Sequence, residues 1–192
     1  IRQSKKDDPN ILPKVTVSDI GKSRSYPICK SYNFSGTSKH FYKAGTNGID
    51  YYQCIHPILK PSFNDLKYAT LFADIMCEVG IKDKNYEYIQ KLQSETLGQI
   101  SSNFTVLRGA NNNNFKLGIK IGGYSLQTKT YEMKELINST INYFRLDEAD
   151  RVNEISKMHL SGIEKSLTNA GHYFAMISAD AQISKLGAIS EI

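Results

Sequence analysis

The 192-residue sequence contains no tryptophan and only three cysteines, Cys29, Cys54 and Cys77. An odd number of cysteines without a C-x-x-C pair argues against a disulfide framework and favours a reducing compartment, either the cytoplasm or an organelle lumen. No stretch approaches the roughly 20 apolar residues of a membrane-spanning helix, so we expect no membrane partner. The chain begins with Ile1 rather than methionine. We therefore expect a fragment of a longer protein, for which a missing targeting signal says little about location.

The sequence also lacks the short motifs that mark common catalytic sites. Neither H-E-x-x-H nor H-x-x-E-H occurs, which excludes a helical zinc site of the metallopeptidase kind within this chain. There is no G-x-S-x-G nucleophile turn. The glycine-containing stretches "LRGANNNN" and "IKIGGYS" match neither phosphate-binding pattern, so we expect Gly122-Gly123 to be a strand end or a bulge. We assign no catalytic and no cofactor-binding residue, and we expect the chain alone to be inactive.

Positive charge is in modest excess, with 24 lysines and arginines against 19 acidic residues and a net charge of +5. The basic residues are scattered along the chain, and the densest group, "RQSKK", is followed at once by "DD". This distribution is typical of a solvated surface rather than of a nucleic-acid-binding face. We therefore do not expect nucleic acid as a partner.

The chain divides into a polar arm and one folded domain. Residues 1–25 are polar and contain Pro9 and Pro13, as a linker does. Residues 26–192 alternate strand and helix patterns and are long enough for one substantial domain.

Two hairpins are predicted. The β-rich segment 26–34 precedes segments 39–45 and 49–58, which flank Asn47-Gly48, the dipeptide that a type I′ turn prefers. We expect those two segments to pair. A second hairpin joins segments 99–109 and 115–126. Along its second arm apolar residues alternate with lysine or glycine, which predicts one buried and one wet face: Leu117, Ile119 and Ile121 against Lys116, Gly118 and Lys120.

Helical periodicity appears in five segments: 62–79, 86–97, 129–144, one starting near Asp147, and 172–185. Ser62 or Asn64 can cap the first, and Asp147 can cap the fourth. The first is apolar on two faces, which predicts that it is covered on both sides. Hairpins interleaved with paired helices predict an α+β fold, an antiparallel sheet with helices packed on one face.

One metal site is conceivable. Cys54 and His56 are two residues apart and share a strand face, and a hairpin turning at Asn47-Gly48 would bring His40 nearly opposite them. No fourth ligand is evident. A cysteine on a buried strand face is most often a small hydrophobic residue, so the favoured interpretation has no metal ligand in this chain.

A free-standing binding module is the alternative function, with peptide or RNA as its ligand. Tyr51 and Tyr52 point to opposite faces of their strand, so only one of them can stack on a base. No RNA-binding run of interleaved basic and aromatic residues occurs.

The order of motifs resembles one family over nearly the whole chain. The matching residues are Leu12-Pro13, Val17-Ser18-Asp19-Ile20, Thr46-Asn47-Gly48-Ile49, Tyr51 and Gly171-His172-Tyr173-Phe174-Ala175. They resemble the segment that opens the second half of presequence-protease-type members of the insulinase/pitrilysin zinc metallopeptidases. One departure is Gly98-Gln99, where the family often has Gly-Gly, which puts a close backbone approach there in doubt.

The resemblance implies a non-catalytic domain of a peptide-degrading enzyme. The two halves of such an enzyme close around a chamber, and its zinc and glutamate base lie in the other half. The arm at residues 1–25 would then leave the interdomain hairpin. This domain would supply chamber wall and substrate contacts, with the other domains of the same polypeptide and an unfolded peptide as partners. The family's substrate-gripping residues lie outside this chain, so none is carried over.

Overall fold

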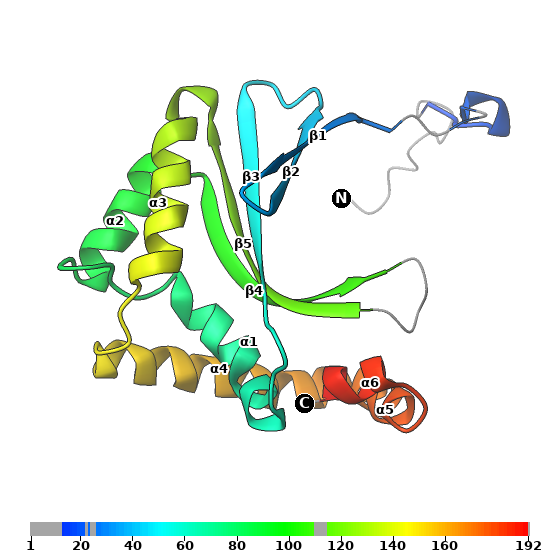
Figure 1. Cartoon of the computed structure of the whole chain (residues 1–192). Helices are drawn as coiled ribbons and strands as arrows, with labels where there is room; N and C mark the ends of the chain where they lie inside the picture. Colours follow the sequence, from blue (N-terminus) through cyan, green and yellow to red (C-terminus); the bar gives the residue numbers. More distant parts are fainter. Residues whose placement is uncertain (1–12, 22, 24–25, 110–114, 192) are drawn as a thin grey trace, which may run out of the picture. The chain divides into compact units, whose positions relative to one another are not determined.

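The computed structural model describes residues 13–21, 23, 26–109 and 115–191 (Figure 1). The chain forms two compact units, residues 1–46 and 47–192, and each is described here by itself. The predicted division between residues 1–25 and 26–192 stays a prediction, because residues 24 and 25 lie outside the described part of the chain.

The first unit contains a short 3-10 helix and a β-hairpin. The 3-10 helix η2 (Val17–Asp19) begins after Thr16, whose hydroxyl donates to Asp19 at 2.8 Å. Strands β1 (Ile28–Phe34) and β2 (Thr37–Lys43) pair antiparallel. The two residues between them, Ser35 and Gly36, have φ angles of 48° and 76°. Positive φ at both turn residues is what a type I′ hairpin requires.

The predicted hairpin around Asn47-Gly48 is wrong. Strand β2 pairs with β1, and β3 (Ile49–Pro57) pairs with β5 (Phe115–Leu126). Asn47 and Gly48 do have positive φ angles, 50° and 81°, but they connect two strands that belong to different sheets. Ser35-Gly36 provides the same turn chemistry earlier in the chain, while the apolar residues of β5 give β3 a partner that buries its inner face.

The second unit is built on a three-stranded antiparallel sheet in the order β3-β5-β4, where β4 spans Gln99–Arg108. The predicted β4-β5 hairpin is confirmed. The expectation for Gly122-Gly123 is wrong, because both lie inside β5 and pair on both sides, Gly122 with Gln53 and Ser101. A Cβ on Gly122 would lie 2.6 Å from the Tyr52 carbonyl oxygen, so close strand approach requires glycine here.

The five predicted helical segments are helical in the predicted order, but the last one, predicted over 172–185, ends at Ala181 and a separate helix begins at Lys185. The bounds are α1 Phe63–Met76, α2 Tyr86–Thr96, the 3-10 helix η3 Gln127–Lys129, α3 Thr130–Tyr143, α4 Ala149–Asn169, α5 Gly171–Ala181 and α6 Lys185–Glu191. Ser62 caps α1, since its hydroxyl accepts from the Asp65 N–H at 3.2 Å. Asp147 does not cap α4, because its carboxylate pairs with the Arg145 guanidinium at 2.8 Å.

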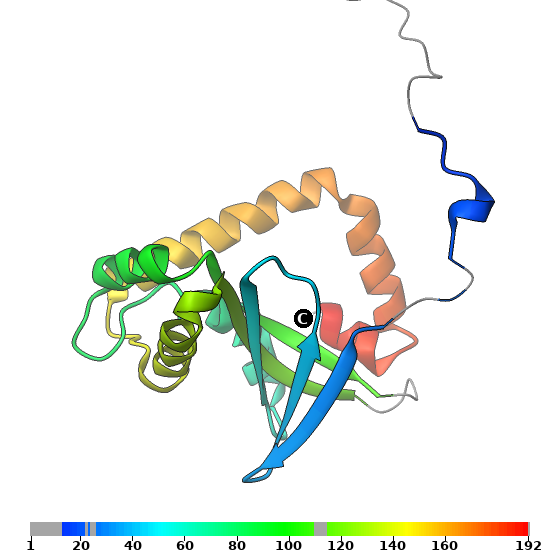
Figure 2. The same cartoon turned by 90° about the horizontal axis from the view of Figure 1, so that it is seen from above.

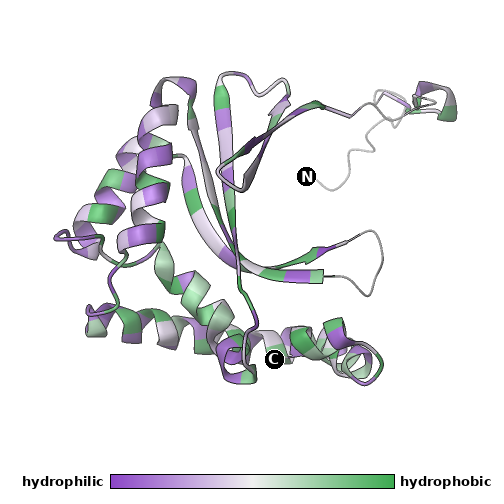
Figure 3. Ribbon diagram, in the orientation of Figure 1, coloured by the Kyte–Doolittle hydropathy of each residue, from purple (hydrophilic) through white to green (hydrophobic). Residues whose placement is uncertain are grey.

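Helices α1, α2 and α3 cover one face of the sheet, which confirms the predicted α+β class (Figure 1). Helix α1 packs against the sheet on one side and against α4 on the other, which confirms the predicted cover on two sides. Figure 3 shows that much of its ribbon is hydrophobic. Its Ala73 packs against Ile119 of β5, and its Ile75 packs with Ile155 of α4. A larger core cluster between the sheet, α2 and α3 centres on Ile121, which is fully buried.

Helix α4 is only partly covered. Val152 and Ile155 near its start pack with α1, whereas Leu160, Ile163 and Leu167 of the predicted apolar side are exposed. Figure 2 shows that α5 leaves the end of α4 at a sharp corner, and α6 then packs on α5.

Candidate functional site

The sheet of the second unit has a covered face and an open face, and Tyr51 and Tyr52 lie on opposite ones. Tyr52 packs against the core under the helices, together with Cys54, whose thiol donates to the Tyr52 hydroxyl at 3.1 Å. This hydrogen bond and burial raise the pKa of Tyr52 to about 12. Tyr51 points the other way and is 64% exposed. The open face is therefore the Tyr51 face.

The open face is formed by alternate residues of all three strands. Strand register places these residues on it: Ile49, Tyr51, Gln53, Ile55 and Pro57 of β3, Lys116, Gly118, Lys120, Gly122, Tyr124 and Leu126 of β5, and Gln99, Ser101, Asn103, Thr105 and Leu107 of β4. The side chains from β3 are exposed except the half-buried Ile49, and those from β4 are exposed except the half-buried Thr105. No helix packs on this surface within the described part of residues 47–192.

The charge on the open face has a single sign. Lys116 and Lys120 of the central strand carry it, and no carboxylate occupies an outward position of the three strands, all of whose residues are described. No ion pair or hydrogen bond joins either lysine side chain to another described residue. By contrast, Lys84 and Lys129 on the helical side lie 3.1 and 3.9 Å from acidic partners. The sheet lysines can therefore attract an anionic ligand without breaking an internal pair.

A hollow of about 170 Å³ lies in the open face. The rings of Tyr51 and Tyr124 form one wall, with their centroids 5.6 Å apart. The floor at Gly122 is bare, because a Cβ there would lie 2.8 Å from the Gln53 side chain. Aromatic walls around a bare backbone floor suit one side chain of an extended peptide.

Polar groups around this hollow are not used within the fold. The side chains of Gln53, Gln99 and Ser101 line it, and none of them hydrogen-bonds to another described residue. On the covered face, by contrast, the Ser102 hydroxyl donates to the Ala73 carbonyl oxygen. The amides and hydroxyl at the hollow can therefore give and accept hydrogen bonds with a ligand.

A second hollow of about 500 Å³ lies between α2 and α3, with Leu92 and Leu136 among its apolar lining residues. Most charged residues at its rim are paired: Lys84 with Asp83, Lys129 with Glu132, and Glu95 with Lys91. It is larger than the hollow in the sheet, but its charged residues carry both signs and are mostly paired, whereas those on the open face are positive and unpaired. We therefore place the candidate functional site on the open face of the sheet.

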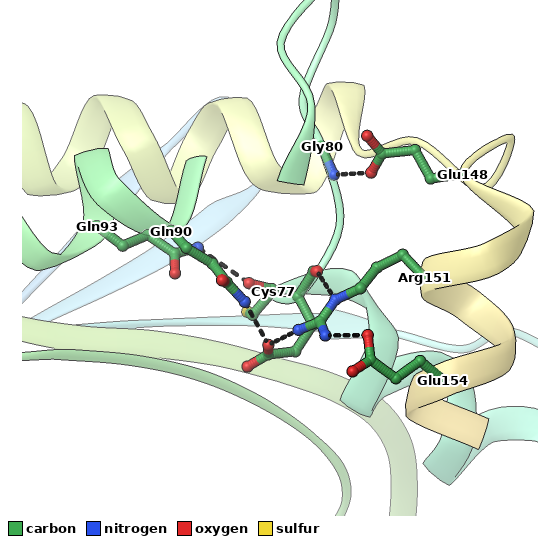
Figure 4. Close-up of polar contacts among 8 residues, drawn as sticks. Cys77, Gly80, Gln90, Gln93, Glu148, Arg151 and Glu154 are labelled. Atoms are coloured by element: carbon green, nitrogen blue, oxygen red, sulfur yellow. Dashed lines mark hydrogen bonds and ion pairs between the residues drawn. The ribbon is translucent and has the colours of Figure 1, made fainter. Parts of the chain in front are cut away.

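Polar contacts between α1, α2 and α4 hold the helical layer behind the sheet (Figure 4). Arg151 of α4 donates to the Glu78 carbonyl oxygen at 3.1 Å and to the Glu78 carboxylate at 2.7 Å, and it also pairs with Glu154 at 2.7 Å. Glu148 accepts from the backbone N–H of Gly80 at 2.6 Å. Each charge has a partner within the fold, so these residues position helices and do not form a reactive site.

The residues of the conceivable metal site lie on strands that do not pair with one another. His40 of β2 faces Ser31 of β1, and its Nδ1 lies 2.9 Å from the Ser31 hydroxyl. Cys54 and His56 share the helix-facing side of β3, opposite Ile121 and Ile119. The pairing on which this site rested is absent. Across residues 13–21, 23, 26–109 and 115–191, no group of three or more His, Cys, Asp and Glu side chains could hold a metal ion.

The thiol of Cys77 is poorly suited to nucleophilic attack. It is 5% exposed in the main core, and burial raises its pKa to about 12. A thiol with such a pKa stays protonated at neutral pH, and the thiolate is the reactive form. Cys77 therefore serves as a packed core residue. In the described residues, no helix is both long and apolar enough to cross a bilayer.

Sequence reasoning finds part of this site and misses part of it. The alternation in 115–126 correctly sets Lys116 and Lys120 on a wet face. The contributions of Gln53 and Tyr124 are missed, because the turn signal predicts the preceding strand as the partner of β3. At Gly98-Gln99, one glycine is enough for close approach: Gly98 lies against the Tyr124 ring and donates its N–H to the Tyr124 carbonyl at 2.9 Å.

Comparison with known proteins gives consistent relatives. A family model matches residues 1–192, and it describes a region associated with peptidase family M16, subfamily C. The chain is 22% identical over 191 residues to the mitochondrial presequence protease of Drosophila melanogaster, covering 99% of this chain and 18% of that protein. It is 25% identical over 190 residues to that of Schizosaccharomyces pombe, covering 98% and 19%. The Clostridium perfringens protein HypA is also 25% identical, over 190 residues, with 97% and 19% covered.

The chain thus spans less than a fifth of the length of these relatives. The match runs from end to end of the chain and agrees with the motif order that indicates presequence-protease-type peptidases. It extends through both structural units and so includes the strands of the open face. The chain belongs to this peptidase-associated family, a non-catalytic region of metallopeptidases of the presequence-protease type.

Proposed function

We infer that this chain supplies part of the wall of a closed chamber in which a longer zinc metallopeptidase degrades unfolded peptides. The observation that supports this most is the open sheet face, where one unpaired lysine, two unused amides and two tyrosines surround a hollow of about 170 Å³. A chamber wall has to present groups that a moving peptide can contact, and it has to be held rigidly from behind. The helices packed on the other face of the sheet meet the second requirement.

The catalytic chemistry of the parent enzyme would come from outside this chain. The sequence has no H-x-x-E-H, and the described residues offer no cluster of metal ligands. A zinc-bound water activated by a glutamate would be supplied by the other half of the parent. The role of this chain is then to bind and orient peptide, which lowers the entropic cost of presenting a peptide bond to the zinc.

The partners proposed for the chain are the other domains of the same polypeptide and an unfolded peptide substrate. The three exposed apolar residues in the second half of α4, Leu160, Ile163 and Leu167, support an interface with another domain. Mitochondrial relatives and the unpaired cysteines agree with a location in an organelle lumen or the cytoplasm.

Peptide binding tests this function. A fluorescein-labelled, unstructured peptide of mixed sequence is titrated with the 192-residue chain and followed by fluorescence anisotropy, while mass spectrometry checks the peptide for cleavage. We expect binding without cleavage, and Tyr51→Ala should weaken binding about fivefold or more. The matched control is Tyr68→Ala, because Tyr68 of α1 is 67% exposed and lies away from both hollows.

Two results would count against this function. Binding unaffected by Tyr51→Ala but lost in Tyr131→Ala would move the site to the hollow between α2 and α3, which Tyr131 lines. Cleavage that persists in chelator-treated, repurified chain would show a catalytic site in this domain.

A free-standing RNA-binding module is the second candidate, and one observation favours it. Tyr51 and Tyr124 lie beside Lys120, and an aromatic ring next to a lysine is a combination that proteins use to bind single-stranded nucleic acids. Titration with a labelled oligonucleotide at two salt concentrations separates the candidates. Steep salt dependence together with affinity above that for peptide would favour RNA.

A further inference from the structure

We propose that the open sheet face selects extended peptide segments that carry two carboxylates about four residues apart, with Lys116 and Lys120 as the groups that bind them. This inference rests on the proposed function, since it names the class of peptide that the same surface prefers. Three features of β5 support it: the sign of its charge, the spacing of the lysines, and the glycines between them.

The first feature is charge complementarity. Lys116 and Lys120 are the charged residues at outward positions of the three fully described strands, and neither has an internal partner. An acidic peptide would gain two ion pairs on this face without displacing an existing one, whereas the charges of a basic peptide would be repelled by both lysines. Other lysines that contact acidic residues, such as Lys84 and Lys129, sit on the helical side.

The second feature is spacing. Lys116 and Lys120 are four residues apart on one strand and therefore project from the same face. Strand residues advance by roughly 3.4 Å each, so the two lysines lie about 14 Å apart along β5. An extended peptide that runs along β5 has the same rise, so side chains four positions apart match both lysines.

The third feature is the set of glycines between these side chains. Gly118 separates Lys116 from Lys120, and Gly122 separates Lys120 from Tyr124. A Cβ on Gly118 would lie 2.8 Å from the His56 carbonyl oxygen, so no side chain can replace it without moving β3. The surface therefore has two low points at which a peptide backbone can approach the sheet.

Beyond Lys120 the hollow provides a third contact. Lys120 itself lines the hollow, whose aromatic wall is Tyr51 and Tyr124. A peptide whose carboxylates sit on Lys116 and Lys120 would place a following residue over this hollow. The preferred segment thus carries two acidic side chains and then an apolar or aromatic one.

The experiment compares three labelled peptides of one unstructured sequence that ends in phenylalanine. They differ only at two positions four apart, which are both Glu, both Gln or both Lys. The 192-residue chain should bind the Glu peptide about fivefold more tightly than the Gln peptide, and the Lys peptide most weakly. Adding salt should narrow these differences.

Charge-matched variants locate the effect. The Lys116→Gln/Lys120→Gln double variant should bind the Glu and Gln peptides equally. The control Lys157→Gln/Lys165→Gln removes the same charge from exposed positions of α4 and should keep the preference. Circular dichroism confirms that both variants fold.

Each outcome decides a separate point. Equal affinity for the Glu and Lys peptides, or an equal loss in both double variants, would overturn the inference. If Tyr51→Ala still weakens the binding of all three peptides in that case, the proposed peptide-binding function stands without the preference for acidic peptides. If no peptide binds, the proposed function falls together with the inference.

Discussion

The carboxylate of Glu148 accepts a hydrogen bond from the backbone N–H of Gly80 at 2.6 Å, across 68 residues of sequence. Its other oxygen accepts from the N–H of Tyr86, the first residue of α2, at 3.1 Å. One side chain before α4 therefore satisfies two backbone donors, one after α1 and one at the start of α2. This contact therefore links the start of α4 to the end of the α1 segment and to the start of α2.

Replacing Glu148 with alanine should destabilise the domain by about 1–3 kcal/mol, because two buried or half-buried N–H groups lose their acceptor. Urea unfolding followed by circular dichroism measures the change. Glu164→Ala is the matched control, since Glu164 is exposed on α4 without a partner among the described residues, and it should change stability little. Equal changes in unfolding free energy for the two variants would show that the hydrogen bonds of Glu148 do not stabilise the domain.

Replacing Arg151 with lysine should lower the free energy of unfolding. Its planar guanidinium binds the carbonyl and the carboxylate of Glu78 together and lies 4.8 Å from the Tyr86 ring centre. A lysine ammonium cannot reproduce this fork, so Arg151→Lys should cost about 1–2 kcal/mol of unfolding free energy. In the more exposed Arg145–Asp147 pair, Arg145→Lys should have a small effect. A small loss at Arg151 as well would contradict the geometric argument.

Alkaline pH should destabilise the domain through Cys77. Burial raises the pKa of its thiol from 9.0 to about 12, so the folded state keeps a proton that the unfolded state loses. The stability contributed by the protonated thiol is complete below pH 9.0 and is lost between pH 9.0 and about 12. The slope from this one group is at most about 1.4 kcal/mol per pH unit.

Unfolding free energies of the wild type and of Cys77→Ala, measured from about pH 8 to 11, test this dependence. The variant should lose less stability over that range, whatever its stability at neutral pH. Thiol labelling gives a second readout: exposed Cys29 should react with iodoacetamide in the native state, whereas Cys77 should react only after unfolding. Parallel stability curves, or rapid native labelling of Cys77, would contradict the account.

Local sequence patterns predict most of the helices and strands. The alternation along 115–126 indicates the two faces of β5, and the apolar faces of α1 predict its cover on both sides. Strand pairing is not readable in the same way, because both Ser35-Gly36 and Asn47-Gly48 can form the turn. What decides between them is burial of the inner face of β3 against β5, a contact between segments distant in sequence.

Side-chain competition explains the other differences. Asp147 can cap a helix in principle, but Arg145 two residues earlier binds its carboxylate through two hydrogen bonds, at 2.9 and 2.8 Å. The open face can be predicted only in part from local pattern. Periodicity along β5 places Lys116 and Lys120 on it, whereas Gln53 and Ser101 can be placed there only when the register of the sheet is known.

Amide chemical-shift mapping shows directly whether unfolded peptide binds the open sheet face. A chain labelled with nitrogen-15 is titrated with the two-glutamate peptide. We expect the largest shifts at Tyr51, Gln53 and Lys120, with little change around Leu92 and Leu136 between α2 and α3. Shifts confined to the hollow between α2 and α3, or no shifts at saturating peptide, would contradict peptide binding on the open face.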